Sequence, residues 1–415
     1  MCPQDSPYSD SYLGVAAENV RSFDLDISEF DCLNLMITAP AYVDAQESLP
    51  VVVWVHGGSN CMGTAYRGVN DPCEWVKRGI EAATPFIVVT IQFRVHLFGF
   101  LPFKGVGNFG LMDQKLAIEW TSKYIHYWGG DRNRISVFGQ SSGSACVYIQ
   151  ACHPERQFQQ AAFLSGSLRS LKCRTIEDYS RLTTRLCEIL ECSEDDLETV
   201  PWQSLVSAFR ETGVLVLSAV DDGIFLPKGA YSQPPSVPLQ KVLMSDCQHD
   251  GWFFKDGLPE GYLVSTVQSL TKSLTIPSDY PLETDEDACR LLTDYIFFAG
   301  NHVTGRQLDG TRVFYECFDA NNPFTPALKS NHMVELFYTL RAYTLPESCE
   351  NASRQIQDAW ARFVYYKEPW EETQLALITD DGIKYIPIED LGNRRQLSAL
   401  EIPELPISNT ITGWV

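Results

Sequence analysis

The stretch Ile135–Cys146, with the sequence ISVFGQSSGSAC, decides the fold. It runs from an apolar, β-branched segment through Gly139-Gln140-Ser141-Ser142-Gly143 into a segment with helical character. A G-x-S-x-G pentapeptide between a strand and a helix is typical of a nucleophile elbow, a strained turn that exposes a serine hydroxyl above a sheet. Both glycines are needed because a Cβ there would meet the neighbouring strand and helix. We therefore expect Ser141 to be a nucleophile rather than part of a turn that only links two elements.

Composition excludes several classes of protein. The 415 residues are 45% hydrophobic, enough for a large core, and carry a net charge of −21. Such an acidic chain is poorly suited to nucleic acid or to an anionic membrane surface. No window of about 18 apolar residues is free of charge, so no membrane span is expected. No Cys/His spacing indicates zinc among the thirteen cysteines, and no cofactor is expected.

The order of patterns along the chain predicts an α/β fold. Short apolar runs alternate with amphipathic helical stretches, which favours a mostly parallel central sheet with helices on both faces. The helix after Ser141 is apolar all round, as expected beneath a sheet. We expect one domain over residues 1–415, with cap or lid insertions around 170–235 and 255–310. The strands expected are Val51–Val55, Ile87–Phe93, Ile135–Phe138, Ala161–Leu164, Lys241–Met244 and Arg312–Phe318.

A serine nucleophile needs a histidine base and a carboxylate that orients it. In α/β-hydrolases the chain order is serine, acid, histidine, and only three histidines follow Ser141. His249 lies too close to the candidate acids to fill a separate role, which leaves His302 and His332 as candidates. The candidate acids, Asp246 and Asp250, both follow the strand at Lys241–Met244, and the glycine after Asp250 favours the latter.

A second group of N–H donors is expected after the strand Val51–Val55. There the sequence His56-Gly57-Gly58 is similar to the H-G-G-G loops that complete an oxyanion hole. Small residues let the backbone approach a substrate oxygen closely, and each such donor is worth roughly 10²–10³ in rate. Taken alone, the same three residues are equally consistent with a simple turn that ends a strand.

These motifs together resemble the type-B carboxylesterase/lipase family, which includes the cholinesterases and has an α/β-hydrolase fold. The resemblance follows the chain in order. It rests on Cys2–Gln4, Asp31–Leu35, Trp54–Gly58, Phe93-Arg94, Gly99–Leu101, Gly107–Gln114, Gly129–Asp131, Ser136–Gly143, Ser165–Ser167, Asp222-Gly223 and His332–Leu336. The last of these is similar to the family's H-x-x-E-L segment, whose histidine is the catalytic base.

The resemblance implies roles for individual residues. Ser141 would be the nucleophile, Asp250 the acid and His332 the base, and His302 would be structural. The N–H groups of Gly58, Ser59 and Ser142 would form the oxyanion hole. The resemblance also implies a Cys2–Cys32 disulfide, which would form only in an oxidising compartment.

The chain departs from the family pattern at four places. Asp250 stands where the family usually has glutamate, and Ser59 where it has a third glycine. Gln140 stands where the family has glutamate and so removes a buried charge. The family also has a sizeable segment before the position of Cys2, whereas here only Met1 precedes it.

The sequence therefore predicts a serine hydrolase that cleaves small-molecule carboxylic esters through an acyl-enzyme. The alternative is a hydrolase-fold enzyme of specialised metabolism that catalyses acyl transfer, lactonisation or cyclisation. A non-catalytic binding protein is disfavoured because all three triad residues are present. The first ten residues, MCPQDSPYSD, lack the features of a signal peptide, so we expect a cytoplasmic protein, or a secreted one if Met1 is a late start. The sequence predicts neither the particular substrate nor the oligomeric state.

Overall fold

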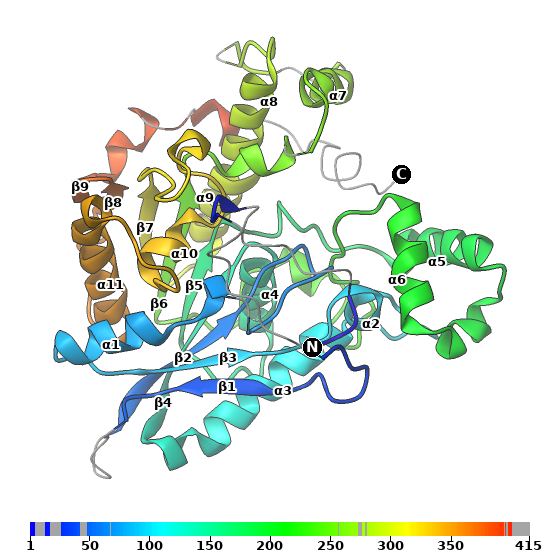
Figure 1. The fold of residues 1–415 in the computed structure, drawn as a ribbon, viewed down its shortest axis with the longest axis horizontal. Helices are drawn as coiled ribbons and strands as arrows, with labels where there is room; N and C mark the ends of the chain where they lie inside the picture. The colour runs from blue at the N-terminus through cyan, green and yellow to red at the C-terminus, as the bar shows by residue number, and fades with distance from the viewer. Residues whose placement is uncertain are drawn as a thin grey trace.

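A nine-stranded sheet runs through the centre of the computed structural model, which describes residues 1–4, 13–16, 26–41, 48–66, 68–255, 257–272, 276–278, 280–393, 395 and 397–400 (Figure 1). Its strand order is β1-β3-β2-β4-β5-β6-β7-β8-β9. The strands are β1 (Leu35–Thr38), β2 (Leu49–Val55), β3 (Ile87–Ile91), β4 (Gly130–Gln140), β5 (Gln160–Leu164), β6 (Lys241–Cys247), β7 (Arg312–Phe318), β8 (Gln374–Thr379) and β9 (Gly382–Pro387).

The sheet is parallel from β3 to β8, and only the edge strands β1 and β9 are antiparallel to their neighbours. All six strands expected from the sequence are present, which confirms the prediction of a mostly parallel sheet. The parallel register brings the carboxyl ends of β2, β4, β5 and β6 to one edge, where ligands bind in open α/β sheets.

Alternate residues of each central strand pack on opposite faces. Val51 and Val53 lie in one apolar cluster with the helices α3 and α4, and Val52 and Trp54 lie in another with α1, α10 and α11. The helices are α1 (Cys73–Glu81), α2 (His96–Phe100), α3 (Phe109–Tyr124), α4 (Ser142–Cys152), α5 (Ile176–Leu190), α6 (Trp202–Thr212), α7 (Tyr262–Thr271), α8 (Asp285–Leu292), α9 (Ala299–Gln307), α10 (Val334–Thr339) and α11 (Glu350–Val364). The prediction that α4 is buried all round is confirmed, because every residue from Ser142 to Ala151 is buried.

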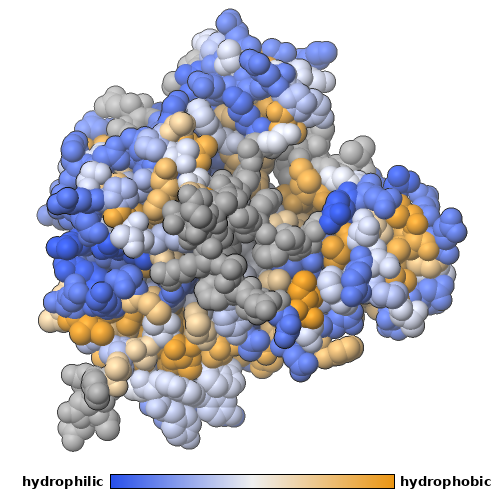
Figure 2. Space-filling model, viewed as in Figure 1, coloured by the Kyte–Doolittle hydropathy of each residue, from blue (hydrophilic) through white to orange (hydrophobic). Residues whose placement is uncertain are grey.

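Two groups of helices project from the sheet (Figure 1). The first, α5 and α6, comes between β5 and β6 in the chain. The second, α7 and α8, comes between β6 and β7 in the chain, and the α9 that follows it packs beside β6. On the face drawn in Figure 2, the lobe that carries α7 and α8 is mostly hydrophilic. None of the helices in the described part of the chain has the length and apolarity to cross a bilayer.

The disulfide implied for Cys2 and Cys32 is not formed, and both residues are buried thiols. The Cys2 thiol donates a hydrogen bond to the carbonyl oxygen of Phe93 over 3.2 Å. A second hydrogen bond joins the two cysteines, and together with burial it raises the pKa of Cys2. The Cys2 sulfur also lies 4.0 Å from the carbonyl oxygen of Cys32, so the two cysteines are neighbours in the fold.

Candidate active site

The turn that carries Ser141 joins the end of β4 to the start of α4. Its φ of 55° and ψ of −124° lie in a strained region of backbone conformation. The Ser141 N–H donates to the carbonyl of Leu164 on β5 over 2.8 Å, which ties the turn to the sheet. A Cβ on Gly139 would lie 2.4 Å from the carbonyl oxygen of Gly143, and one on Gly143 would lie 2.3 Å from that of Val55. Only glycine fits at either position.

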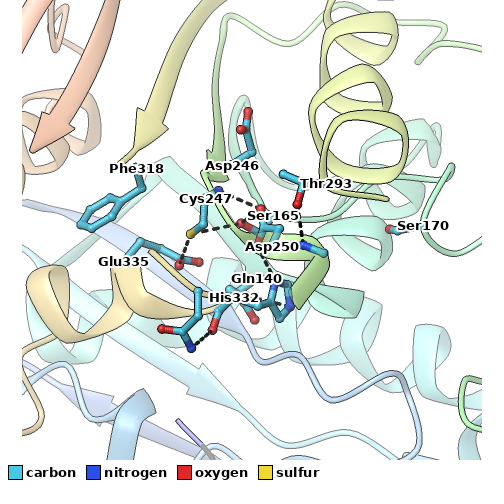
Figure 3. A network of polar contacts seen from close by, with 12 residues as sticks. Gln140, Ser165, Ser170, Asp246, Cys247, Asp250, Thr293, Phe318, His332 and Glu335 are labelled. Atoms are coloured by element: carbon cyan, nitrogen blue, oxygen red, sulfur yellow. Dashed lines mark hydrogen bonds and ion pairs between the residues drawn. The ribbon is translucent and has the colours of Figure 1, made fainter. Parts of the chain in front are cut away.

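His332 lies between β7 and α10, and its ring faces the end of β6 (Figure 3). Its Nδ1 lies 2.6 Å from Oδ1 of Asp250, and because a carboxylate only accepts, Nδ1–H is the donor in this contact. In the neutral form of the ring this tautomer has its lone pair on Nε2. The rings of Phe253 and Phe297 lie 5.5 and 5.3 Å from the imidazole. The half-buried Phe253 therefore reaches the site.

Asp250 is fully buried at the start of a 3₁₀ turn, Asp250–Phe254, that follows β6. Its Oδ1 faces His332, and its Oδ2 accepts hydrogen bonds from the Cys247 N–H over 2.7 Å and from the Ser165 hydroxyl over 3.0 Å. Three donors around one carboxylate fix its orientation. The aspartate, although one methylene shorter than glutamate, reaches the imidazole.

The other acid considered, Asp246, has a different partner. It forms a buried ion pair with Arg395, a residue 149 positions further along the chain. Burial raises the pKa of Asp246 to about 6, and the arginine opposes that rise. Asp246 is therefore held in a structural ion pair.

The two remaining candidate histidines contact other groups. His249 packs edge-on against Trp252, and His302 on α9 lies between the rings of Phe298 and Tyr315. Burial lowers the pKa of each to about 4. Unlike these two, His332 contacts a carboxylate at the carboxyl end of β6.

The segment after β2 bends sharply at Gly58, Ser59 and Asn60, whose φ values of 120°, 58° and 57° are all positive. It lies directly over the turn that carries Ser141, because a Cβ on the preceding Gly57 would be 2.9 Å from that of Ser141. Among the residues that the structure describes, no hydrogen bond occupies the N–H of Gly58, Ser59 or Ser142. These three donors are available to a ligand near Ser141.

Asn60, which the sequence did not single out, anchors this bend. Its Nδ2 donates to the carbonyl of Leu217 over 2.8 Å, and the Leu217 N–H returns a bond to the Ser59 carbonyl over 3.0 Å. The backbone N–H of Asn60 donates to the Ser142 hydroxyl over 3.2 Å. Because Leu217 follows α6, these hydrogen bonds join the bend to the segment after α5 and α6.

A buried thiol and a second buried acid extend the network behind Asp250 (Figure 3). The Cys247 thiol donates to Oε2 of Glu335 over 3.0 Å, because burial raises the pKa of Cys247 well above its ordinary value and keeps the sulfur protonated. Burial also raises the pKa of Glu335 to about 7. The H-x-x-E-L segment contains this glutamate, but the sequence does not indicate its contact with Cys247.

A parallel sheet with a serine on the turn between β4 and α4 defines an α/β-hydrolase fold. A model of the Carboxylesterase family matches residues 1–261, and the chain belongs to that family of carboxylic ester hydrolases. Lipase 3 of Yarrowia lipolytica is 27% identical over 388 residues, which cover 89% of this chain and 78% of the relative. The para-nitrobenzyl esterase of Bacillus subtilis is 25% identical, with coverage of 85% and 80%. A solved structure of a PNB esterase has the same fold, with a TM-score of 0.72, 23% identity and coverage of 89% and 85%.

Proposed function

We propose that this chain hydrolyses small-molecule carboxylic esters through a covalent acyl-enzyme on Ser141. His332 would serve as the base and Asp250 as the acid that orients it. The observation that carries the proposal is the 2.6 Å contact between His332 and Asp250, two residues 82 positions apart that meet at the edge of the sheet where Ser141 lies.

The reaction has two halves. In the first, Ser141 Oγ attacks the ester carbonyl carbon while His332 Nε2 takes the hydroxyl proton. The bond to the alcohol oxygen then breaks, and the imidazolium returns the proton to that oxygen. In the second half, His332 takes a proton from water, the hydroxide attacks the acyl carbonyl, and the acid leaves as Ser141 regains its proton. Asp250 stays ionised and stabilises the imidazolium in both halves.

The oxyanion would be held by the N–H groups of Gly58, Ser59 and Ser142. Their freedom from internal hydrogen bonds in the described structure supports this role. Donors fixed in advance by the backbone need not reorganise when charge develops on the carbonyl oxygen, which is why they lower the barrier. These backbone N–H groups would contact only the carbonyl oxygen, so they do not indicate the size of the alcohol or the acyl chain. The size of the substrate must therefore be measured.

The test is the release of p-nitrophenol from its acetate, butyrate and octanoate esters. The wild type should turn over at least one of these, and Ser141→Ala should be slower by several orders of magnitude. Ser144→Ala, one turn further along α4, removes a hydrogen bond to Gly166 and should stay within about tenfold of the wild type.

Labelling with a fluorophosphonate distinguishes ester hydrolysis from the alternative reactions of the same serine. Labelling of Ser141 without ester hydrolysis would favour acyl transfer, lactonisation or cyclisation by the same serine. A folded protein with neither labelling nor turnover would overturn the proposal.

A further inference from the structure

The hydroxyl of Ser142 contacts the backbone of the bend that follows β2. Ser142 is the first residue of α4 and is fully buried, and its own N–H makes no hydrogen bond within the described structure. Its Oγ lies 3.2 Å from the backbone nitrogen of Asn60, and because a peptide N–H can only donate, the hydroxyl oxygen is the acceptor. One residue therefore carries one of the three available donors and contacts the segment that carries the other two.

A second contact joins Asn60 to the same face of α4. Cys146 lies four residues after Ser142, which places the two side chains one turn apart on the helix. The Cys146 thiol donates to Oδ1 of Asn60 over 3.5 Å. Burial raises the pKa of Cys146 to about 12, so the thiol stays protonated and can donate. Helix α4 thus binds both the backbone and the side chain of Asn60.

Three consecutive N–H groups of the bend have different partners. Those of Gly58 and Ser59 make no hydrogen bond within the described structure, whereas that of Asn60 is bound to Ser142. All three residues have positive φ, and a backbone of this kind persists only where the surrounding contacts maintain it. Without the Ser142 hydroxyl, the buried Asn60 N–H would lose its acceptor and the bend would lose a direct connection to α4.

We propose that Ser142 is a positioning residue, whose hydroxyl holds the bend at a fixed distance from the start of α4. The N–H groups of Gly58, Ser59 and Ser142 can then converge on one oxygen atom. The inference rests on the proposed function, in which that atom is the carbonyl oxygen of the substrate. Hydrogen bonds weaken steeply as their geometry departs from linear, so a small shift of the bend would weaken two of the three donors. The hydroxyl would act through these N–H groups without contacting the substrate.

The first experiment compares Ser142→Ala with the wild type on the p-nitrophenyl ester that the wild type hydrolyses fastest, with active sites counted by fluorophosphonate titration. We expect kcat per active site to fall roughly tenfold with KM within about twofold, because the donors act mainly in the transition state. A trifluoromethyl ketone, which forms a tetrahedral adduct with a serine, should lose affinity by a similar factor. A kcat or a ketone affinity within about twofold of the wild type would overturn the inference.

Ser136→Ala is the matched control, since Ser136 on β4 is also fully buried and its hydroxyl donates to the side chain of Gln160 over 3.2 Å. In this variant kcat per active site should stay within about twofold of the wild type. Equal losses in the two variants would contradict a specific role for the Ser142 hydroxyl.

A second experiment does not depend on activity. Peptides that cover residues 58–62 should exchange their amide hydrogens faster in Ser142→Ala than in the wild type or in Ser136→Ala. Unchanged exchange would overturn the inference. Faster exchange in a variant of a wild type that hydrolyses no ester would instead support the role of the hydroxyl in holding the bend, and the proposed function would have failed.

Discussion

At the scale of single residues, Asp250 and Asp246 differ in what faces their carboxylates. Asp250→Asn keeps the shape of the side chain but stabilises the wrong tautomer of His332, so kcat should fall by about 10⁴. Asp246→Asn leaves Arg395 buried without its counter-charge and should cost about 3–5 kcal/mol of stability, with a much smaller change in kcat per folded enzyme. Ester kinetics and urea unfolding of both variants measure the two effects. The roles would be reversed if Asp246→Asn gave the larger loss of kcat in the folded fraction.

The sequence could narrow the acid to two residues but could not separate them by local physics. Both follow the same strand, and the glycine after Asp250 was only a preference for a turn. Arg395, which forms the ion pair with Asp246, lies 149 residues further along the chain, and no local sequence pattern predicts that pairing. In the same way, the contact between Gln140 and His332 depends on the packing of β4 against a loop 192 positions later.

At the scale of elements, patterns of burial explain which strands were found. Each of the interior strands β2 to β7 contains a short, mostly apolar and buried run, and all six were predicted. The strands missed were β1 and β9 at the two edges, together with β8 beside β9. The partly exposed residues of β1 and β9 give mixed patterns that periodicity does not identify. The sequence thus predicted the part of the sheet that carries the site.

The bend after β2 depends on a contact with another element. Asn60→Ala removes the hydrogen bond to the Leu217 carbonyl, so the donors of Gly58 and Ser59 would be held less firmly. We expect kcat to fall roughly 10- to 100-fold with little change in KM, because the donors act mainly on the transition state. Asn70→Ala is the matched control, since Asn70 is also buried and donates its amide to a carbonyl, that of Thr64. Equal losses of kcat in both variants would contradict a specific role for Asn60.

At the scale of the whole molecule, a buried acid within the sheet contributes to how stability varies with pH. Glu316 on β7 accepts a hydrogen bond from Trp360, and burial raises its pKa from 4.5 to about 8. Between these values the folded state holds a proton that the unfolded state has released. The free energy of unfolding should therefore decrease as pH rises from about 5 to 8, by up to about 1.4 kcal/mol per unit for this group.

Glu316→Gln keeps the acceptor for Trp360 and removes the titration, so the decrease in unfolding free energy should be shallower in this variant. Glu211→Gln, at an exposed position on α6, should leave the slope unchanged. Urea unfolding at pH 5, 6, 7 and 8 measures all three proteins. Parallel slopes in the wild type and Glu316→Gln would show that Glu316 binds its proton equally in the folded and unfolded states, which would contradict the raised pKa.

The two hydrogen bonds between Leu217 and the bend after β2 also connect the segment after α6 to events at Ser141. The Leu217 amide exchanges with solvent deuterium only when its bond to the Ser59 carbonyl opens. A phosphonate bound to Ser141, with its oxygen on the neighbouring N–H groups, would make that opening rarer. Because such coupling is reciprocal, a molecule that stabilises these hydrogen bonds of the segment after α6 would strengthen the binding of the reacting carbonyl oxygen. It would do so without touching the serine or the histidine.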